Sequence, residues 1–182
     1  RDRVSFLETQ HHTYLNLQRT LIALNKIPEA LEVADRSRAR SLMSFLAAAK
    51  AQTQTDLSAA EMQAVARQQN GTIVLYSVIE IDSELYIWVV PPIGEISFRR
   101  IPLPKDESDL AKTAQDIRNS AITIGRGGTT RPGYNLLIKP IADLLPTTPA
   151  AKVIIVPHRE LALVPFAALQ DDPVSYTHLR AH

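Results

Sequence analysis

The sequence predicts an α/β chain with a helical segment at its N-terminal end. Three observations lead to this fold class. Residues 1–90 contain one Pro and one Gly, whereas residues 91–182 contain eleven Pro and five Gly, so long regular elements should give way to shorter ones joined by turns. Apolar residues recur at helical spacing before residue 70, and runs of β-branched and aromatic residues follow from residue 72. A hydrophobic fraction of 45% is sufficient for a core and excludes global disorder.

Composition narrows the function classes. The chain of 182 residues carries 20 Lys+Arg against 19 Asp+Glu, and a net charge of +1 gives no field that attracts nucleic acid or anionic lipid. Its apolar runs are shorter than a membrane span, and no signal-peptide pattern opens it. We therefore expect a cytoplasmic protein without nucleic-acid or membrane partners, although a start at Arg1 rather than Met leaves the natural N-terminus open. The absence of Cys excludes disulfides, thiolate metal sites and a cysteine nucleophile within this chain.

The first fifty residues predict a helical hairpin. The apolar stripe of its first helix comprises Tyr14, Leu17, Leu21 and Leu24, with Leu15 and Ile22 beside it. A turn at 25–28 ends in Pro28, which suits the start of a new helix. No helix breaker occurs from Glu29 to Lys50, and the apolar face there comprises Ala30, Leu31, Ala34, Leu42, Phe45 and Leu46.

A linking helix should follow within residues 51–70. Ser58 and Glu61 have the spacing of a capping box, in which the serine side chain and the glutamate side chain each bond the other residue's backbone N–H. Asn70-Gly71 is a plausible end for this helix, because both residues tolerate the left-handed conformation that closes many helices.

The rest of the chain predicts strands and short helices. Residues 72–79, 85–90 and 95–101 have strand composition and short links, which predicts an antiparallel β-meander. Two helices should follow, the first with Leu110, Ala114, Ile117 and Ala121 on one face, and the second with Tyr134, Leu137, Ile138, Ile141 and Leu145. Pro140 must kink or split the second helix. Residues 152–156 are almost wholly apolar and predict a buried strand, for which a parallel direction suits the composition. The strand should be central in the complete sheet, but its later neighbours lie beyond this chain, so we expect an exposed strand edge and poor solubility here.

Four motifs invite a functional interpretation, and the residues favour a structural one for each. The glycine-rich segment 125–133 follows a helix and lacks the lysine of a P-loop, so we expect a surface loop. His158 and Glu160 have the H-x-E spacing of zinc deaminases, but that chemistry also needs two cysteines. His11 and His12 are adjacent on a helix and are poorly placed to share a metal. The arginines at 36, 38 and 40 follow acidic residues and predict a solvated helix surface.

Residues 11–44 resemble a tetratricopeptide repeat, a helix-turn-helix of 34 residues. Ala30 takes the place of the small packing residue of the second helix, and Tyr14, Leu17 and Leu21 then fall on expected first-helix positions. Gln18 departs from the pattern, because a small residue is usual there. One such unit buries its apolar face only against neighbours, so we expect it to be the last of a longer array or to dock on the following domain.

Residues 29–173 resemble a CHAT domain, a caspase-like domain found attached to tetratricopeptide repeats. The resemblance lies in residues 29–42 (EALEVADRSRARSL), 72–76 with 85–90 (TIVLY, LYIWVV), 134–145 (YNLLIKPIADLL) and 153–169 (VIIVPHRELALVPFAAL). It implies a cysteine endopeptidase lineage in which a His and a Cys, both beyond the last of these stretches, carry the chemistry. No residue of this chain matches either catalytic motif, so we expect no catalytic, cofactor-binding or metal-binding residue here, and His158 is interpreted as a structural turn residue.

The resemblance implies three segments and a tail. Residues 1–50 are the last repeat-like hairpin and an exit helix, and residues 51–70 are a linking helix. Residues 71–173 are the N-terminal part of the CHAT domain, with the first strand of a caspase-like sheet. Residues 174–182 depart from the family pattern and are interpreted as a possibly artefactual tail.

Three interpretations stay open. The first is a fragment of a repeat-regulated cysteine peptidase, whose repeats bind protein partners or peptide substrates. The second is a non-enzymatic scaffold with a degenerate CHAT domain. The third is a helical adaptor joined to an unrelated α/β domain.

Overall fold

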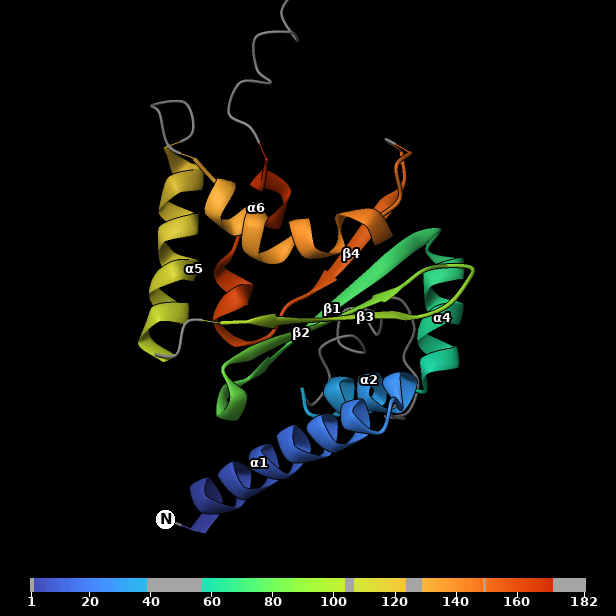
Figure 1. Ribbon diagram of the computed structural model, residues 1–182, viewed down its shortest axis with the longest axis vertical. Helices are drawn as coiled ribbons and strands as arrows, with labels where there is room; N and C mark the ends of the chain where they lie inside the picture. The colour runs from blue at the N-terminus through green and yellow to red at the C-terminus, as the bar shows by residue number, and fades with distance from the viewer. Residues whose placement is uncertain (1, 39–56, 104–106, 124–128, 149, 172–182) are drawn as a thin grey trace, which may run out of the picture. The chain divides into compact units, whose positions relative to one another are not determined.

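The computed structural model describes residues 2–38, 57–103, 107–123, 129–148 and 150–171. Its α-helices are α1 (Asp2–Ala23), α2 (Ile27–Arg36), α4 (Ala59–Gln68), α5 (Glu107–Ile122) and α6 (Arg131–Leu137). Its strands are β1 (Gly71–Ile79), β2 (Glu84–Val90), β3 (Ser97–Pro102) and β4 (Lys152–Val156). Short 3₁₀ segments are η1 (Glu80–Asp82), η3 (Lys139–Leu144), η4 (Arg159–Leu163) and η5 (Phe166–Ala168). The predicted α/β fold class is confirmed (Figure 1).

The four strands form one mixed sheet in the order β3-β2-β1-β4. The three strands that are consecutive in sequence are neighbours, as a meander requires. β4 runs parallel to β1, with a register from Gly71 opposite Lys152 to Leu75 opposite Val156. All residues of β1 and all but the first of β2 are buried, because most of their side chains are apolar or aromatic on both faces; Thr72 and Ser77 are buried polar residues of β1.

The chain divides into two compact units. The first consists of residues 1–77, 87–98 and 146–156, and it holds α1, α2, α4, β4 and the larger parts of β1 and β2. The second consists of residues 78–86, 99–145 and 157–182, and it holds α5, α6 and the 3₁₀ segments. The two units are described separately below.

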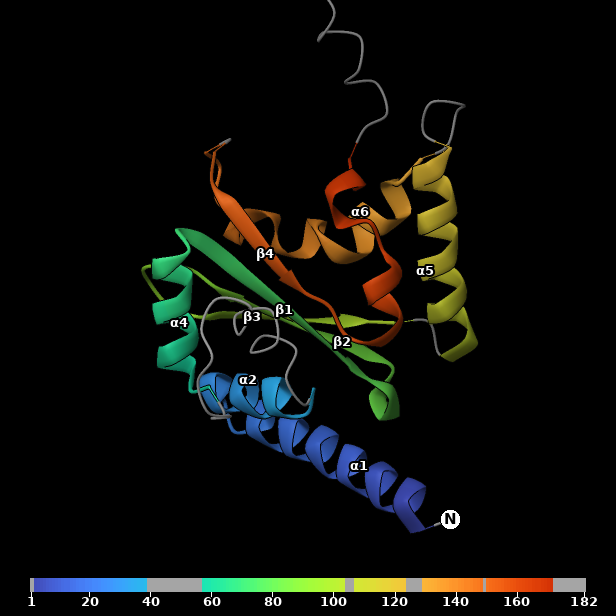
Figure 2. The ribbon, with the colours of Figure 1, turned by 180° about the vertical axis from the view of Figure 1, so that it is seen from behind.

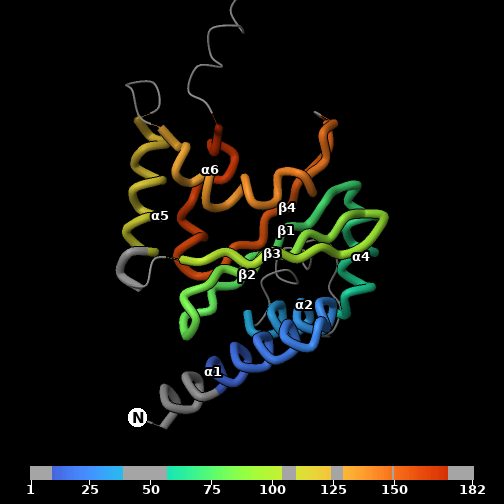
Figure 3. The backbone as a smooth tube through the Cα atoms, in the orientation of Figure 1, coloured from blue at the N-terminus to red at the C-terminus, as the bar shows by residue number. Residues whose placement is uncertain are grey.

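In the first unit, α1 and α2 pack side by side as the predicted hairpin (Figures 1 and 2). Figure 3 follows the chain through the turn between them, where Asn25 has φ of 57° and Pro28 lies in the first turn of α2. The predicted stripe of α1 is confirmed only in part, since Tyr14, Leu21 and Ile22 are half-buried. Leu15 and Gln18 are fully buried, whereas Leu17 is 41% and Leu24 is 62% exposed. The predicted face of α2 is confirmed at Ala30, Leu31 and Ala34.

The second helix of the hairpin ends earlier than predicted. We expected an unbroken helix from Glu29 to Lys50, but α2 ends at Arg36 and a turn follows. The Ser37 hydroxyl donates to the carbonyl oxygen of Ala34 at 2.8 Å, which is the local side-chain bond that competes with helix continuation. Residues 39–56, which include Arg40, Leu42, Phe45 and Leu46, lie outside the described residues.

The capping box of α4 is confirmed. The Glu61 N–H donates to Ser58 Oγ at 3.2 Å, and the Ser58 N–H donates to Glu61 Oε2 at 2.7 Å. The helix ends at Gln68, and Asn70 takes the expected left-handed conformation, with φ of 47°, before Gly71 opens β1. A Cβ on Gly71 would lie 3.0 Å from the carbonyl oxygen of Lys152, so the parallel strand packs closely there.

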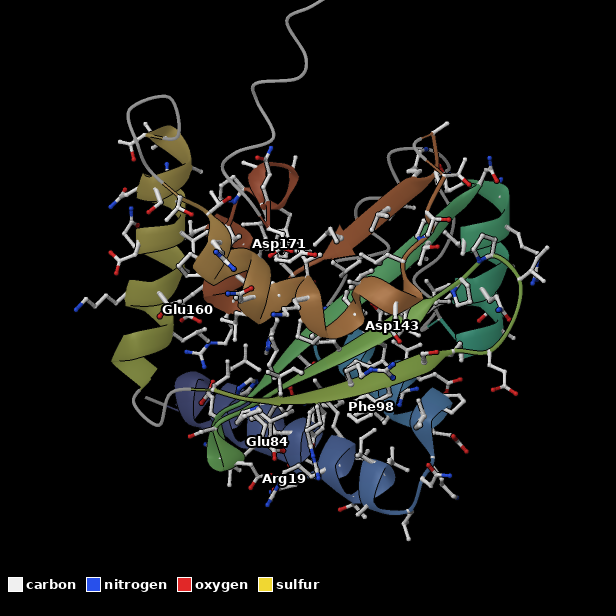
Figure 4. All side chains as sticks on the ribbon, turned by 45° about the horizontal axis from the view of Figure 1, so that its top comes forward. Arg19, Glu84, Phe98, Asp143, Glu160 and Asp171 are labelled. Carbon is white, nitrogen blue, oxygen red and sulfur yellow. The ribbon has the colours of Figure 1, made fainter. Side chains whose placement is uncertain are left out.

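In the second unit, the predicted faces of α5 and α6 are largely confirmed. Leu110, Ala114 and Ile117 are buried on α5, and Leu137 and Ile141 are buried further on. Pro140 splits the second helix, because α6 ends at Leu137 and η3 begins at Lys139. The ion pair between Arg99 of β3 and Asp143 of η3, at 3.0 Å, lies at the surface of this unit (Figure 4).

The burial predicted for β4 is confirmed only at Val156, and the exposed edge expected of this strand is found in the described sheet. β4 is its edge strand, and Lys152 and Val153 are exposed, although the parallel direction is confirmed. An apolar run alone does not distinguish a central strand from an edge strand, since that depends on which other segments pair with it. The expected tail, residues 174–182, lies outside the described residues.

Candidate functional site

Polar residues of the second unit gather where β1 and β4 end. In open sheets, the carboxyl ends of parallel strands are the usual place for ligand sites. Glu80 follows β1 directly, and His158, Arg159 and Glu160 follow β4 after one proline. We call these four residues the strand-end cluster; Glu160 is labelled in Figure 4.

His158 is bonded to the backbone of β1. Its Nδ1 atom accepts a hydrogen bond from the Val78 N–H at 2.9 Å. An imidazole nitrogen that accepts carries no proton, so the ring is neutral with its proton on Nε2. In this state Nε2 donates and cannot take a proton from a nucleophile. The contact gives His158 a role in holding the turn after β4 to the end of β1.

Arg159 connects the acidic members of the strand-end cluster. Its guanidinium forms ion pairs with Glu80 and, at 3.3 Å, with Glu160. The backbone of Arg159 is left-handed, with φ of 52°, which a non-glycine residue adopts only where surrounding contacts hold it. The ion pairs thus tie the turn after β4 to the residue that follows β1. Among the described residues, no group of His, Asp and Glu is arranged to hold a metal ion.

A second polar group, in the first unit, was not predicted. Arg38 Nη1 donates to the carbonyl oxygen of Val156, at the end of β4, at 3.2 Å. Burial lowers the pKa of the Arg38 guanidinium, and the nearby charge of Asp35 partly offsets this effect. The interpretation of the arginines as a solvated helix surface is therefore wrong for Arg38. Arg36 is exposed, and Arg40 lies outside the described residues.

Gln18 is the other buried polar residue that sequence reasoning missed. Its Oε1 accepts from the Ser77 hydroxyl at 2.8 Å, and both residues are fully buried. Its Nε2 atom has no hydrogen-bond partner among the described residues. The one signal in the sequence was the departure from the repeat pattern, in which a small residue is usual at this position.

The remaining motifs contribute no assembled site. The rings of His11 and His12 lie 6.1 Å apart between centroids. Gly125, Gly127 and Gly128 lie outside the described residues. Gly133 is part of α6, where an added Cβ would lie 2.9 Å from side-chain atoms of both Ile117 and Leu169. The close packing of α6 against these side chains therefore explains why position 133 is a glycine, and no phosphate-binding role is needed to explain it.

Thr130 secures the same region. Its hydroxyl donates to the carbonyl oxygen of Ala168 at 2.8 Å and accepts from the Gln170 N–H at 3.1 Å. The Thr130 hydroxyl therefore joins two segments that are about forty residues apart in sequence, at the start of α6. In the structure, this threonine of the glycine-rich segment has a packing role.

Comparison with known proteins identifies no relative, because no family model, curated protein or solved structure matches the chain. No helix within the described part of the chain is long and apolar enough to cross a membrane.

Proposed function

We propose that the chain is the N-terminal, non-catalytic part of a CHAT-type cysteine endopeptidase that acts in the cytoplasm and is regulated by tetratricopeptide repeats. The observation that carries the proposal is the order of elements: a helical hairpin, then a sheet in which β4 returns parallel to β1. That order agrees with the sequence resemblance over residues 29–173. The chain has no Cys, so it supplies no thiolate nucleophile itself.

In this proposal the helical hairpin provides the regulatory surface. Leu17 and Leu24 are exposed on α1, seven residues apart and therefore on one face of the helix. Exposed apolar residues at such spacing suit the packing of another helix. A protein partner or a peptide substrate that contacts this face would be coupled to the sheet, because Gln18 of α1 is bonded to Ser77 of β1.

The strand-end cluster has a structural role in this proposal. His158 is held by its bond to the Val78 N–H, and Arg159 is neutralised by Glu80 and Glu160. These residues order the turn after β4, from which the peptidase domain would continue. The catalytic His and Cys would lie on that continuation.

The proposal is tested on the parent protein by measuring cleavage of peptide substrates in the presence of a reducing agent. We expect thiol-dependent cleavage that is lost when the proposed nucleophilic Cys is replaced by Ala. The double variant Leu17→Ser with Leu24→Ser, in the helical hairpin, should keep the fold but change how strongly a bound partner alters the rate of peptide cleavage. Its matched control is Ile93→Ser, which alters an isoleucine that is 84% exposed outside the hairpin.

A scaffold without enzymatic activity is the second candidate. It is favoured by the absence of Cys from the chain, because a degenerate CHAT domain without a thiolate can still bind protein partners. Unchanged partner binding together with absent peptide cleavage by the parent protein would establish the scaffold and refute the peptidase.

A further inference from the structure

A cleft lies between α5 and the start of α6 in the second unit. Its volume is about 230 Å³, which is below the roughly 300–1,000 Å³ of pockets for drug-sized ligands and suits a single side chain. Its walls are formed by Thr113, Asp116, Ile117, Ser120, Thr129 and Pro132. It shares no residue with the strand-end cluster, and its function does not depend on the proposed peptidase lineage.

One polar group of the cleft has a partner, because the Thr129 hydroxyl accepts from the Arg131 N–H at 3.2 Å. Asp116 and the hydroxyls of Thr113 and Ser120 form no hydrogen bond or ion pair within the described residues. Helical hydroxyls elsewhere behave differently. Thr20 of α1 donates to the carbonyl oxygen of Asn16 at 2.9 Å, as hydroxyl groups on helices commonly do. The cleft therefore presents a carboxylate and two hydroxyls that are free to bind a ligand.

The spacing of these groups is set by α5. Thr113, Asp116 and Ser120 are three and four residues apart, so their side chains lie one above another on the same face of the helix. Ile117 is buried beside them and Pro132 stands opposite on α6, so the cleft also has an apolar wall. A carboxylate next to an apolar wall matches a ligand that has a cationic end on an alkyl stem.

We propose that this cleft binds the side chain of an arginine presented by a peptide or protein partner. The guanidinium would donate to the Asp116 carboxylate with two parallel N–H groups, the strongest geometry available to such a pair. Its remaining N–H groups would reach the Thr113 and Ser120 hydroxyls, and its methylene groups would pack on Ile117 and Pro132. An anionic ligand is disfavoured, because the charged side chain among the described residues that line the cleft is the Asp116 carboxylate.

The probe for the test is N-acetyl-arginine amide, titrated into the isotope-labelled chain and followed by two-dimensional amide NMR. We expect saturable shifts confined to residues 113–120 and 129–132, with Kd in the millimolar range that is usual for one side chain, of order 1 mM. Asp116→Asn should weaken binding roughly tenfold, because the charge-assisted bonds are lost. Asp171→Asn, at an exposed aspartate outside the cleft, should leave Kd unchanged (Figure 4).

Two further arms separate the proposal from simple charge attraction. The amide of N-acetyl-citrulline has the same shape without the charge, and it should bind roughly tenfold more weakly. Ser120→Ala, which keeps the carboxylate and favours the helix, should weaken binding of the arginine probe without loss of fold. Equal binding of the two probes, shifts spread over all acidic residues, or no saturable shift would each overturn the proposal.

Discussion

At the scale of single residues, the buried polar groups distinguish this chain from a purely apolar core. Gln18 is fully buried on α1 and is bonded to Ser77 on β1 at 2.8 Å. Such a pair fixes the helix on the strand, because an unpaired amide or hydroxyl in the interior is unfavourable. Both residues belong to the first unit, and the free energy that their hydrogen bond contributes to folding can be measured.

Replacing Gln18 by Leu should lower the free energy of unfolding by about 1–3 kcal/mol, because the Ser77 hydroxyl loses its buried partner. The double variant Gln18→Leu with Ser77→Ala should recover part of that loss, because no polar group is then left unpaired. Urea unfolding of both single variants and the double variant measures this coupling. Gln10→Leu, at an exposed position of the same helix, is the control. Strictly additive losses would show that the pair has no energetic role.

The capping box of α4 makes a prediction about pH. Hydrogen bonds from the Ser58 backbone and side chain lower the pKa of Glu61 below its ordinary value. Because the folded-state pKa is lowered, the stabilisation is present above the unfolded-state pKa and is lost as pH falls through the folded-state pKa. NMR titration should show the pKa of Glu61 rising toward its ordinary value in Ser58→Ala, whereas Ser58→Thr should retain the lowered value. An identical titration of Glu61 in wild type and Ser58→Ala would contradict the cap.

At the scale of secondary-structure elements, β1 dominates the core. All nine of its residues are buried, including Tyr76, whose side chain is among the largest fully enclosed. Burial raises the pKa of the Tyr76 hydroxyl, because the phenolate cannot be hydrated inside the protein. The strand is therefore sensitive to alkaline conditions.

The contribution of Tyr76 to the free energy of unfolding should be constant below a pH of about 10, which is the pKa of an ordinary tyrosine. The free energy of unfolding should fall as the pH rises above this value. The unfolded chain loses the proton there while the folded chain retains it. Tyr76→Phe should make the alkaline loss of stability less steep, as measured by urea unfolding at a series of pH values. The control Phe98→Leu removes a ring that does not ionise and whose centroid lies 5.2 Å from that of the Trp88 ring. This variant should lower the free energy of unfolding equally at every pH. Equal steepness for Tyr76→Phe and wild type would refute the assignment.

The edge strand β4 predicts self-association. Its free edge within the described sheet carries Val153, which is 37% exposed, in a short apolar run. Such an edge pairs readily with another chain. Light scattering should show poor solubility at high protein concentration, and Val153→Lys should reduce the scattering several-fold, because a charge on an edge opposes pairing. Ile93→Lys is the control at an exposed turn. A stable monomer with a sharp cooperative melt would contradict the prediction.

The elements also show what the sequence could and could not predict. The strands β1 and β2 were predicted to within one residue, because β-branched and aromatic runs specify them locally. The buried face of α1 was predicted only in part. Leu15 is buried as expected, but Leu17 and Leu24 on the adjoining face are exposed, because packing selects the face with Leu15. The hydrogen bond from Arg38 joins it to a carbonyl oxygen 118 residues away, which no local pattern contains.

At the scale of the whole molecule, the chain combines a helical hairpin unit with a second α/β unit and provides no thiol. The turn that holds His158 could be located from the sequence, because prolines flank a polar group after an apolar run. The bond from the Val78 N–H to His158 could not, since it joins residues 80 positions apart. The same holds for the cleft at Asp116, which exists only because α6 returns to α5.

The central claim is that this chain belongs to a CHAT-type cysteine endopeptidase. Its most direct test is to read the coding sequence of the parent protein for about 150 codons, a typical domain length, beyond the stretch that ends at Leu169. The account predicts a His and a Cys there, each directly after an apolar run of strand composition, as the resemblance over residues 29–173 implies. A continuation in which neither residue follows such a run would contradict the claim.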